Sequence, residues 1–246
     1  MAASKFKMFK SLYYKDLRET RAEVLIVAIT AIVSILWVWA KTEGDSRMII
    51  MVPAVALMGL AGLLPIITSF RLLGREWGHN TIYLMMSLPI SGAMMLGSKL
   101  LVLLTEYLAG TLLVGIISSI AIFISFPDLV PELSRQADLI LMIKILISLY
   151  AASIAAIVYL FSCSFLSQLC GKLFPRASGL ITLVVFLLLL IAPGKLSPEW
   201  SWNLSYPATD IASQIGFIWI YTGITLVFAL LLLAASIWIW ERRIEL

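Results

Sequence analysis

The sequence predicts an all-α membrane protein with six transmembrane helices and, before them, an amphipathic helix at the membrane surface. Composition is the first observation behind this class. Of the 246 residues, 61% are hydrophobic and 13% are charged, and the mean hydropathy is +1.02, which excludes a water-soluble domain. The second observation is that apolar runs of roughly 20 residues, long enough to cross a bilayer, recur along the chain. Together these runs account for the length of the chain, so residues 1–246 are expected to form a single transmembrane domain.

Residues 1–21 are expected to form the surface helix. Phe6, Phe9, Tyr13 and Leu17 recur at spacings of three or four, and lysines and arginines occupy the other positions. This pattern is typical of a basic amphipathic helix with its apolar stripe in the membrane interface. The alternative, a solvated basic tail, would leave that stripe without a place to be buried. The apolar run that follows has no small-residue cleavage site after it, so it is expected to be an anchor and not a removed signal peptide.

The six predicted spans differ in length and in their small or helix-bending residues. They are residues 22–40, 48–70, 94–126, 139–166, 177–192 and 214–240. The second contains Pro53 and Pro65, which permit kinks. The third is long enough to tilt or to begin below the membrane surface. In the fourth, two pairs of alanines spaced by four residues allow a neighbouring helix to approach closely.

Positive charge predicts the orientation of these spans. Cytoplasmic loops carry an excess of Lys and Arg, and thirteen of the 18 such residues fall on the side of the N-terminus. The thirteen are Lys5, Lys7, Lys10, Lys15, Arg18, Arg21, Arg71, Arg75, Lys99, Lys172, Arg176, Arg242 and Arg243, and the other five are Lys41, Arg47, Arg135, Lys144 and Lys195. Both termini are therefore predicted to be cytoplasmic. Orientation also explains the net charge of +4, so nucleic-acid binding is not expected.

A polar segment, residues 71–93, separates the second and third spans. Its first half gathers polar side chains around one tryptophan: Arg75, Glu76, Trp77, His79, Asn80 and Thr81. So many polar groups exclude burial in hydrocarbon. An apolar patch that includes Tyr83 follows, and Pro89 ends any helix at about Leu88. Apolar area rimmed by charge marks an interaction site, and a merely solvated charge run is the alternative.

A second polar stretch, residues 195–213, separates the last two spans. Trp200, Trp202 and Tyr206 alternate there with polar residues and prolines. Such aromatic side chains favour the membrane interface, and the pattern fits a segment that dips into the interface without crossing it. An ordinary external loop with aromatic anchors is the alternative.

Glu106 is the only acidic residue placed well inside a predicted span. Such residues usually face the interior of a helix bundle or a water-filled path. Glu106 is therefore a candidate for the transport path, or for a pair with Lys99 seven residues earlier. Because the third span is long, the alternative is a place near the cytoplasmic interface, where Glu106 only stabilises the helix end.

The sequence gives little support for catalysis within the chain. The two Gly-Lys pairs, at Lys172 and Lys195, lack the flanking residues of a phosphate-binding loop. There is one histidine, and the two cysteines, Cys163 and Cys170, are expected to pack as small apolar side chains. Neither a metal site nor a disulfide framework is predicted. No catalytic residue and no cofactor is assigned to this chain.

The central segment resembles a known family. The residues concerned are Glu76, Thr81, the run Ser87-Leu88-Pro89-Ile90-Ser91, and Lys99. This pattern is similar to the first cytoplasmic loop of ABC-2-type transporter permeases. The chain departs from it at Asn80, where a glycine is common, and at Gly92, where an arginine often follows the serine.

In that family the loop holds a coupling helix that docks on a separate ATPase subunit. The resemblance implies that the coupling residues here are Arg75, Glu76, Trp77, His79, Asn80, Thr81 and Tyr83. It also implies two cytoplasmic ATPase subunits, which carry ATP and magnesium, and a second permease copy, identical or homologous. By the same resemblance, residues 1–21 correspond to the elbow helix of a type V exporter-like domain, and residues 195–213 to its re-entrant segment.

The implied function is the membrane subunit of an ATP-driven exporter in a bacterial or archaeal plasma membrane. Its cargo would be a peptide, a drug-like molecule or a lipid-like amphipath, and the chain would not be an enzyme by itself. A self-contained channel or secondary transporter is the alternative, but the sequence shows no internal repeat and no set of intramembrane charges for it. A membrane-embedded enzyme would need paired acids, histidines or metal ligands within single spans, which the sequence lacks.

Overall fold

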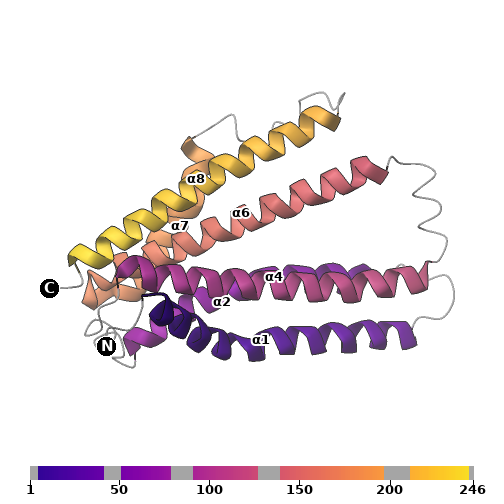
Figure 1. The fold of residues 1–246 in the computed structure, drawn as a ribbon, viewed down its shortest axis with the longest axis horizontal. Coiled ribbons are helices and arrows are strands. Elements are labelled where there is room, and N and C mark those ends of the chain that lie inside the picture. Colours follow the sequence, from indigo (N-terminus) through magenta and orange to yellow (C-terminus); the bar gives the residue numbers. More distant parts are fainter. Residues whose placement is uncertain (1–4, 42–50, 79–90, 127–138, 197–210, 244–246) are drawn as a thin grey trace. The chain divides into compact units, whose positions relative to one another are not determined.

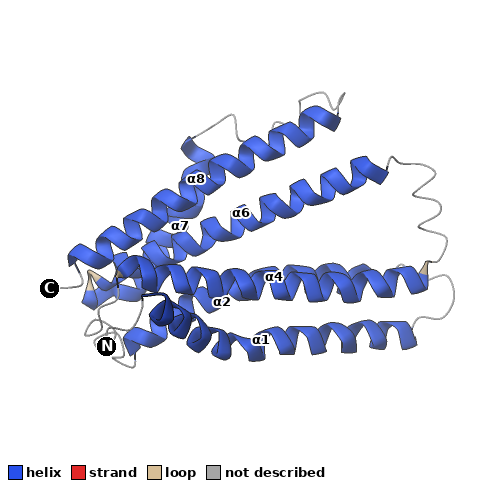
Figure 2. Ribbon diagram, in the orientation of Figure 1, coloured by secondary structure: helices blue, strands red, loops and turns tan. Residues whose placement is uncertain are grey.

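The computed structural model describes residues 5–41, 51–78, 91–126, 139–196 and 211–243. Nearly all of them are helical, and this part of the chain contains no strand (Figure 2). The helices are α1 (Lys5–Lys41), α2 (Met51–Gly78), α4 (Gly92–Ser125), α6 (Leu139–Lys172), α7 (Ser178–Leu196) and α8 (Ile211–Arg243), with a short 3₁₀ turn, η2 (Pro175–Ala177), before α7 (Figure 1). The prediction of an all-α protein is confirmed.

Within the described ranges, five helices are long and apolar enough to cross a membrane: α1, α2, α4, α6 and α8. Between 17% and 33% of the residues in their most apolar windows are buried within the chain. The remaining apolar surface requires lipid or another protein, as expected of a multi-pass membrane protein. The apolar part of α7, Ser178–Ala192, is shorter than these windows. The whole helix, with 19 residues, is roughly 28 Å long.

The predicted surface helix and the predicted first span belong to one helix in the structure. α1 runs from Lys5 to Lys41 without a break. The sequence between these residues contains neither glycine nor proline, so nothing in it interrupts the helix. The expected elbow is therefore the first part of α1 and not a separate element.

α2 ends at Gly78, so it extends beyond the predicted second span and includes the beginning of the polar segment 71–93. Leu72, Leu73 and Glu76 are buried and continue the buried face that includes Thr68 and Ser69. Positions three and four apart lie on one side of a helix, so packing along this face outweighs the polarity of the segment. Residues 71–78, the first part of the predicted polar segment, therefore lie in α2.

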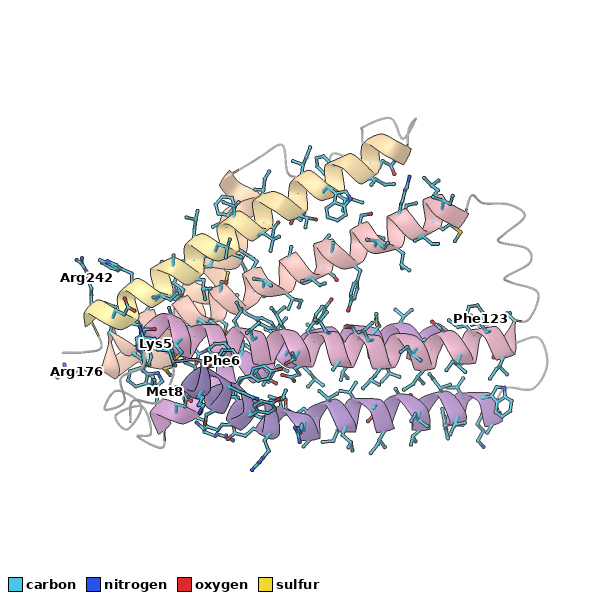
Figure 3. The ribbon with its side chains drawn as sticks, in the orientation of Figure 1. Lys5, Phe6, Met8, Phe123, Arg176 and Arg242 are labelled. Atoms are coloured by element: carbon cyan, nitrogen blue, oxygen red, sulfur yellow. The ribbon has the colours of Figure 1, made fainter. Side chains whose placement is uncertain are left out.

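The other helices also differ from the predicted spans at their ends. α4 begins at Gly92, α6 ends at Lys172, and α8 extends from Ile211 to Arg243. Polar residues at a helix end keep helical backbone hydrogen bonds even where they leave the apolar region. α7 continues to Leu196, beyond the predicted end of the fifth span. The basic residues Arg176 and Arg242 lie in η2 and at the end of α8 (Figure 3).

The chain divides into two compact units, and the divisions fall within α2, α4 and α6. Unit 1 comprises Met1–Thr68 and Ser98–Met142, and unit 2 comprises Ser69–Gly97 and Ile143–Leu246. Unit 1 therefore holds α1, the first part of α2 and most of α4. Unit 2 holds the end of α2, the start of α4 and nearly all of α6, together with α7 and α8.

In unit 1, α1 and α4 lie side by side and run in the same direction (Figure 1). The core contains Val27, Ala31, Leu57, Ala61 and Val114. A side-chain carbon at Gly110 would lie 3.7 Å from the Cβ atom of Ala61. This contact between two small residues allows α2 and α4 to approach closely, as is common between membrane helices.

In unit 2, α7 is held by contacts with α6 and with the end of α2. The hydroxyl of Tyr159 on α6 donates to the carbonyl oxygen of Leu189 at 2.6 Å. The rings of Phe70 on α2 and Phe186 on α7 pack edge to face, with centroids 5.0 Å apart. These contacts place α7 against two neighbours despite its shorter length.

Candidate functional site

Three of the predicted coupling residues lie at the end of α2 and differ in exposure. Arg75 is exposed and Trp77 is half-buried, whereas Glu76 is only 6% exposed. Glu76 lies on the buried face of α2, together with Leu72 and Leu73. Direct contact between Glu76 and a partner protein would therefore require this end of α2 to move. Of the three residues, Arg75 is the one whose side chain is exposed.

Trp77 connects the end of α2 with the ends of two other helices of unit 2. The ammonium nitrogen of Lys172, the last residue of α6, lies 5.4 Å from the centroid of the Trp77 ring. The ring of Trp240 on α8 lies 6.2 Å away, with the two ring planes at 67°. Both are favourable geometries for an aromatic ring, the first for a cation and the second for another ring.

Trp240 also packs against the start of α4. A side-chain carbon at Gly92 would lie 2.6 Å from Cδ1 of Trp240, closer than two carbon atoms can approach. Only glycine therefore allows the indole ring to lie against the backbone here. We call Trp77, Gly92, Lys172 and Trp240 the tryptophan junction. Its central residue, Trp240, contacts Trp77 and Gly92, which lie on either side of the chain segment that joins α2 to α4.

Gly92→Ala is expected to lower the free energy of unfolding by about 1–2 kcal/mol, within the range for overpacking. The new methyl group would displace the Trp240 ring, which as a side chain has some freedom to move. Gly97→Ala is the matched control, because no atom lies within 4 Å of its added carbon. Thermal unfolding of both variants in detergent checks this, and equal unfolding midpoints would contradict a contact between Gly92 and Trp240.

Further along α2, a buried hydrogen-bond network joins this helix to α6. Ser69 Oγ donates to Ser164 Oγ at 2.8 Å. Gln168 Nε2 donates to Ser164 Oγ at 3.1 Å and to the carbonyl oxygen of Ser69 at 3.3 Å. Neither serine has exposed surface. Because such groups find no water to replace these bonds, the network fixes the register of α2 on α6.

A second polar arrangement lies in unit 1, where α1 contacts α4. Lys99 Nζ lies 3.2 Å from Asp16 Oδ2. The two residues are only 1% and 3% exposed, respectively. Lys99 thus forms a salt bridge with a residue of another helix. The hypothesis that Lys99 pairs with Glu106 did not include this partner. An ion pair buried to this extent favours one register between the two helices.

Glu106 lies at the boundary of the apolar part of unit 1. Its Oε1 atom is 3.1 Å from the hydroxyl oxygen of Thr68 on α2, and Glu23 Oε2 on α1 is 2.6 Å from the same oxygen. Glu23 is the last charged residue before the apolar stretch of α1, and no charged residue follows Glu106 in α4. Glu106 therefore lies near one end of the uncharged part of α4, and which side of a membrane this end faces stays a prediction.

The contacts of Lys99 and Glu106 repeat with the same spacing on both helices. Asp16 and Glu23 are seven residues apart on α1, as are Lys99 and Glu106 on α4. Seven residues are close to two helical turns, so both contacts lie along one seam between the helices. This matched spacing of charged residues is the signal that could have identified Asp16 and Glu23 from the sequence. The spacing does not reveal Thr68, which comes from a third helix.

Several predicted site residues lie outside the part of the chain that the structure describes. They are His79, Asn80, Thr81 and Tyr83 in the central segment, and Trp200, Trp202 and Tyr206 in the predicted re-entrant segment. Within the described ranges, no group of three or more His, Cys, Asp or Glu residues could hold a metal ion. Comparison of the chain with protein families, with curated proteins and with solved structures finds no match.

Proposed function

We propose that this protein is the membrane-spanning permease subunit of an ATP-driven ABC transporter of the ABC-2 type. Two copies, or one copy and a homologue, would enclose the path for a peptide, drug-like or lipid-like amphipathic cargo. Two ATPase subunits on other chains would supply the energy, and ATP and magnesium would bind to them. The six predicted spans and the cytoplasmic location of both termini belong to this proposal.

The main support for this proposal comes from the tryptophan junction. The chain segment between α2 and α4 begins beside Trp77 and ends beside Gly92, and both contact Trp240. A partner that moved this segment would act on the ends of α2 and α4, on α8 through Trp240, and on α6 through Lys172. A transporter that takes its energy from a separate chain needs such a connection between its docking segment and several helices.

The network of Ser69, Ser164 and Gln168 supports the same role for α2 and α6. It lies on α2 between the junction and the apolar part of the helix, and joins the two helices through hydrogen bonds of 2.8–3.3 Å. A displacement at Trp77 would therefore move α6 together with α2. Arg75, with its exposed side chain, is the described residue best placed to meet an acidic group on the ATPase.

A self-contained secondary transporter remains the second candidate, because one observation favours it. Glu106, only 4% exposed, meets a second carboxyl group at Thr68, and buried acids are common in ion-coupled carriers. The two functions differ in their energy source. Transport by the purified chain alone, driven by an ion gradient, would support the second candidate against the first.

Trp240→Leu tests the proposed coupling. We expect this variant to bind the ATPase subunit normally and to lose transport by roughly tenfold, a typical size for a coupling free energy between two sites. Trp238→Leu is the matched control, because Trp238 lies two residues earlier on α8 and is 54% exposed. Co-purification and ATP-dependent transport in vesicles measure the two effects. Failure of the wild-type protein to bind any ATPase encoded beside it would contradict the proposed function.

A further inference from the structure

The hydroxyl group of Thr68 contacts three oxygen atoms within unit 1. Thr68 Oγ1 lies 2.6 Å from Glu23 Oε2, 3.1 Å from Glu106 Oε1 and 3.1 Å from the carbonyl oxygen of Leu64. The distance of 2.6 Å is that of a short hydrogen bond, and the two distances of 3.1 Å lie just above the usual range for O–H···O bonds. Two carboxyl groups from different helices therefore meet at one hydroxyl group from a third.

The number of hydrogens at this hydroxyl group constrains the two carboxyl groups. A threonine hydroxyl has one hydrogen to donate and two lone pairs that accept. If Glu23 and Glu106 were both ionised, all three neighbouring oxygens would be acceptors, and the single hydrogen could form one full hydrogen bond or be divided between two weaker ones. At least one carboxylate would then have no full hydrogen bond to Thr68, while two like charges are held at one hydroxyl oxygen, at 2.6 and 3.1 Å.

A protonated carboxyl group removes this conflict, because it has an O–H group that can donate to Thr68. Thr68 can then donate its own hydrogen to the other carboxylate. We propose that Glu23 and Glu106 bind one proton between them at neutral pH and share it through the hydroxyl group of Thr68. The three residues form a proton-binding site that carries one negative charge and joins α1, α2 and α4.

The surrounding charges are compatible with one shared proton. The titratable or charged residues within two helical turns of the three site residues are Asp16, Arg18, Glu19 and Arg21 on α1, Arg71 and Arg75 on α2, and Lys99 and Tyr107 on α4. Lys99 is bound to Asp16, so together they add little net charge. The side chains of the four arginines are exposed. Glu19 adds negative charge one turn before Glu23 and so favours retention of the proton.

Release of the proton would change the contact between the three helices. Two carboxylates would then be held at one hydroxyl group in a partly dehydrated place, where like charges repel strongly. The contact of α1 and α4 with α2 at Thr68 would loosen, while the salt bridge between Asp16 and Lys99 would remain. The proton therefore acts as a ligand that stabilises one arrangement of unit 1.

Infrared spectroscopy of the purified full-length protein in detergent tests this proposal, because a protonated carboxyl group has a carbonyl band distinct from that of carboxylates. We expect the wild-type protein to show one such band at neutral pH and to lose it as the pH is raised. Glu23→Gln and Glu106→Gln should each lack the band, since the amide N–H group replaces the shared proton as donor to Thr68. Glu241→Gln, an exposed position at the end of α8, should retain it.

Absence of the band from the wild-type protein at neutral pH would overturn the proposal, as would its persistence in both glutamine variants. Loss of the band in only one of them would place the proton on that glutamate alone and so contradict sharing. The titration of the wild-type protein requires no variant, so the test does not depend on how the variants fold. It is also independent of the proposed transport function, because neither ATP nor a partner protein is present.

Discussion

Replacing Lys99 by methionine is expected to lower the free energy of unfolding by about 3–5 kcal/mol, the usual cost of removing one partner from a buried ion pair. Lys99 and Asp16 are 1% and 3% exposed, and their charged atoms are 3.2 Å apart. Lys15 does not replace the lost ammonium group, because it lies 3.9 Å from Asp16 Oδ1 and its side chain is 46% exposed. The measurement is chemical or thermal unfolding of the purified protein in a mild detergent.

Two further variants separate the loss of the pair from the loss of packing. Lys15→Met should cost less than about 1 kcal/mol, because the Lys15 side chain is largely in water and such ion pairs contribute little. The double variant Asp16→Asn with Lys99→Met should recover much of the stability lost in Lys99→Met alone, because no uncompensated charge stays buried. If Lys99→Met and Lys15→Met were equally stable, the buried salt bridge between α1 and α4 would be ruled out.

Gly171→Ala is expected to have the second large effect, about 2–3 kcal/mol or more, at the upper end of the range for overpacking. A side-chain carbon at Gly171 would lie 2.7 Å from the carbonyl oxygen of Ser178 and would overlap the hydroxyl oxygen of Thr182. A carbonyl oxygen belongs to the backbone and cannot rotate away as the Trp240 ring can near Gly92. The turn between α6 and α7 would have to open, so both the yield of folded protein and its unfolding temperature should fall.

Gly179→Ala is the matched control for this prediction, because no atom lies within 4 Å of the carbon it would add. It lies near the start of α7, eight residues from Gly171, and adds the same methyl group. We expect its unfolding temperature to equal or exceed that of the wild type, since alanine favours a helix more than glycine does. Wild-type stability in Gly171→Ala would contradict the close contact between the end of α6 and α7.

The sequence was sufficient to predict the class of the protein, because apolar runs and their spacing depend only on local composition. Helix ends were harder to predict. The predicted second span ends at residue 70 because the residues after it are polar, yet α2 continues to Gly78 because Leu72, Leu73 and Glu76 extend its buried face. Burial of this kind depends on neighbouring helices, which a single sequence does not specify.

The candidate site illustrates the same limit. The position of Trp77 in a segment between two spans was visible in the sequence, but its contact with Trp240 was not, because the two residues lie on helices far apart in the chain. Gly92 was noted only as a departure from a family pattern, and its physical reason is the Trp240 ring. The seam between α1 and α4 was also missed, although Asp16, Glu23, Lys99 and Glu106 share one spacing.

Position-specific photo-crosslinking is the most direct test of the central claim, that the segment between α2 and α4 receives motion from an ATPase on another chain. A photoreactive amino acid placed at Asn80, within that segment, should crosslink to the ATPase subunit in intact membranes. The same group at Phe126, at the opposite end of α4 from Gly92, should give no such product. A crosslink from position 80 that depends on the nucleotide state of the ATPase is the predicted result. Its absence in membranes that actively transport cargo would contradict the proposed function.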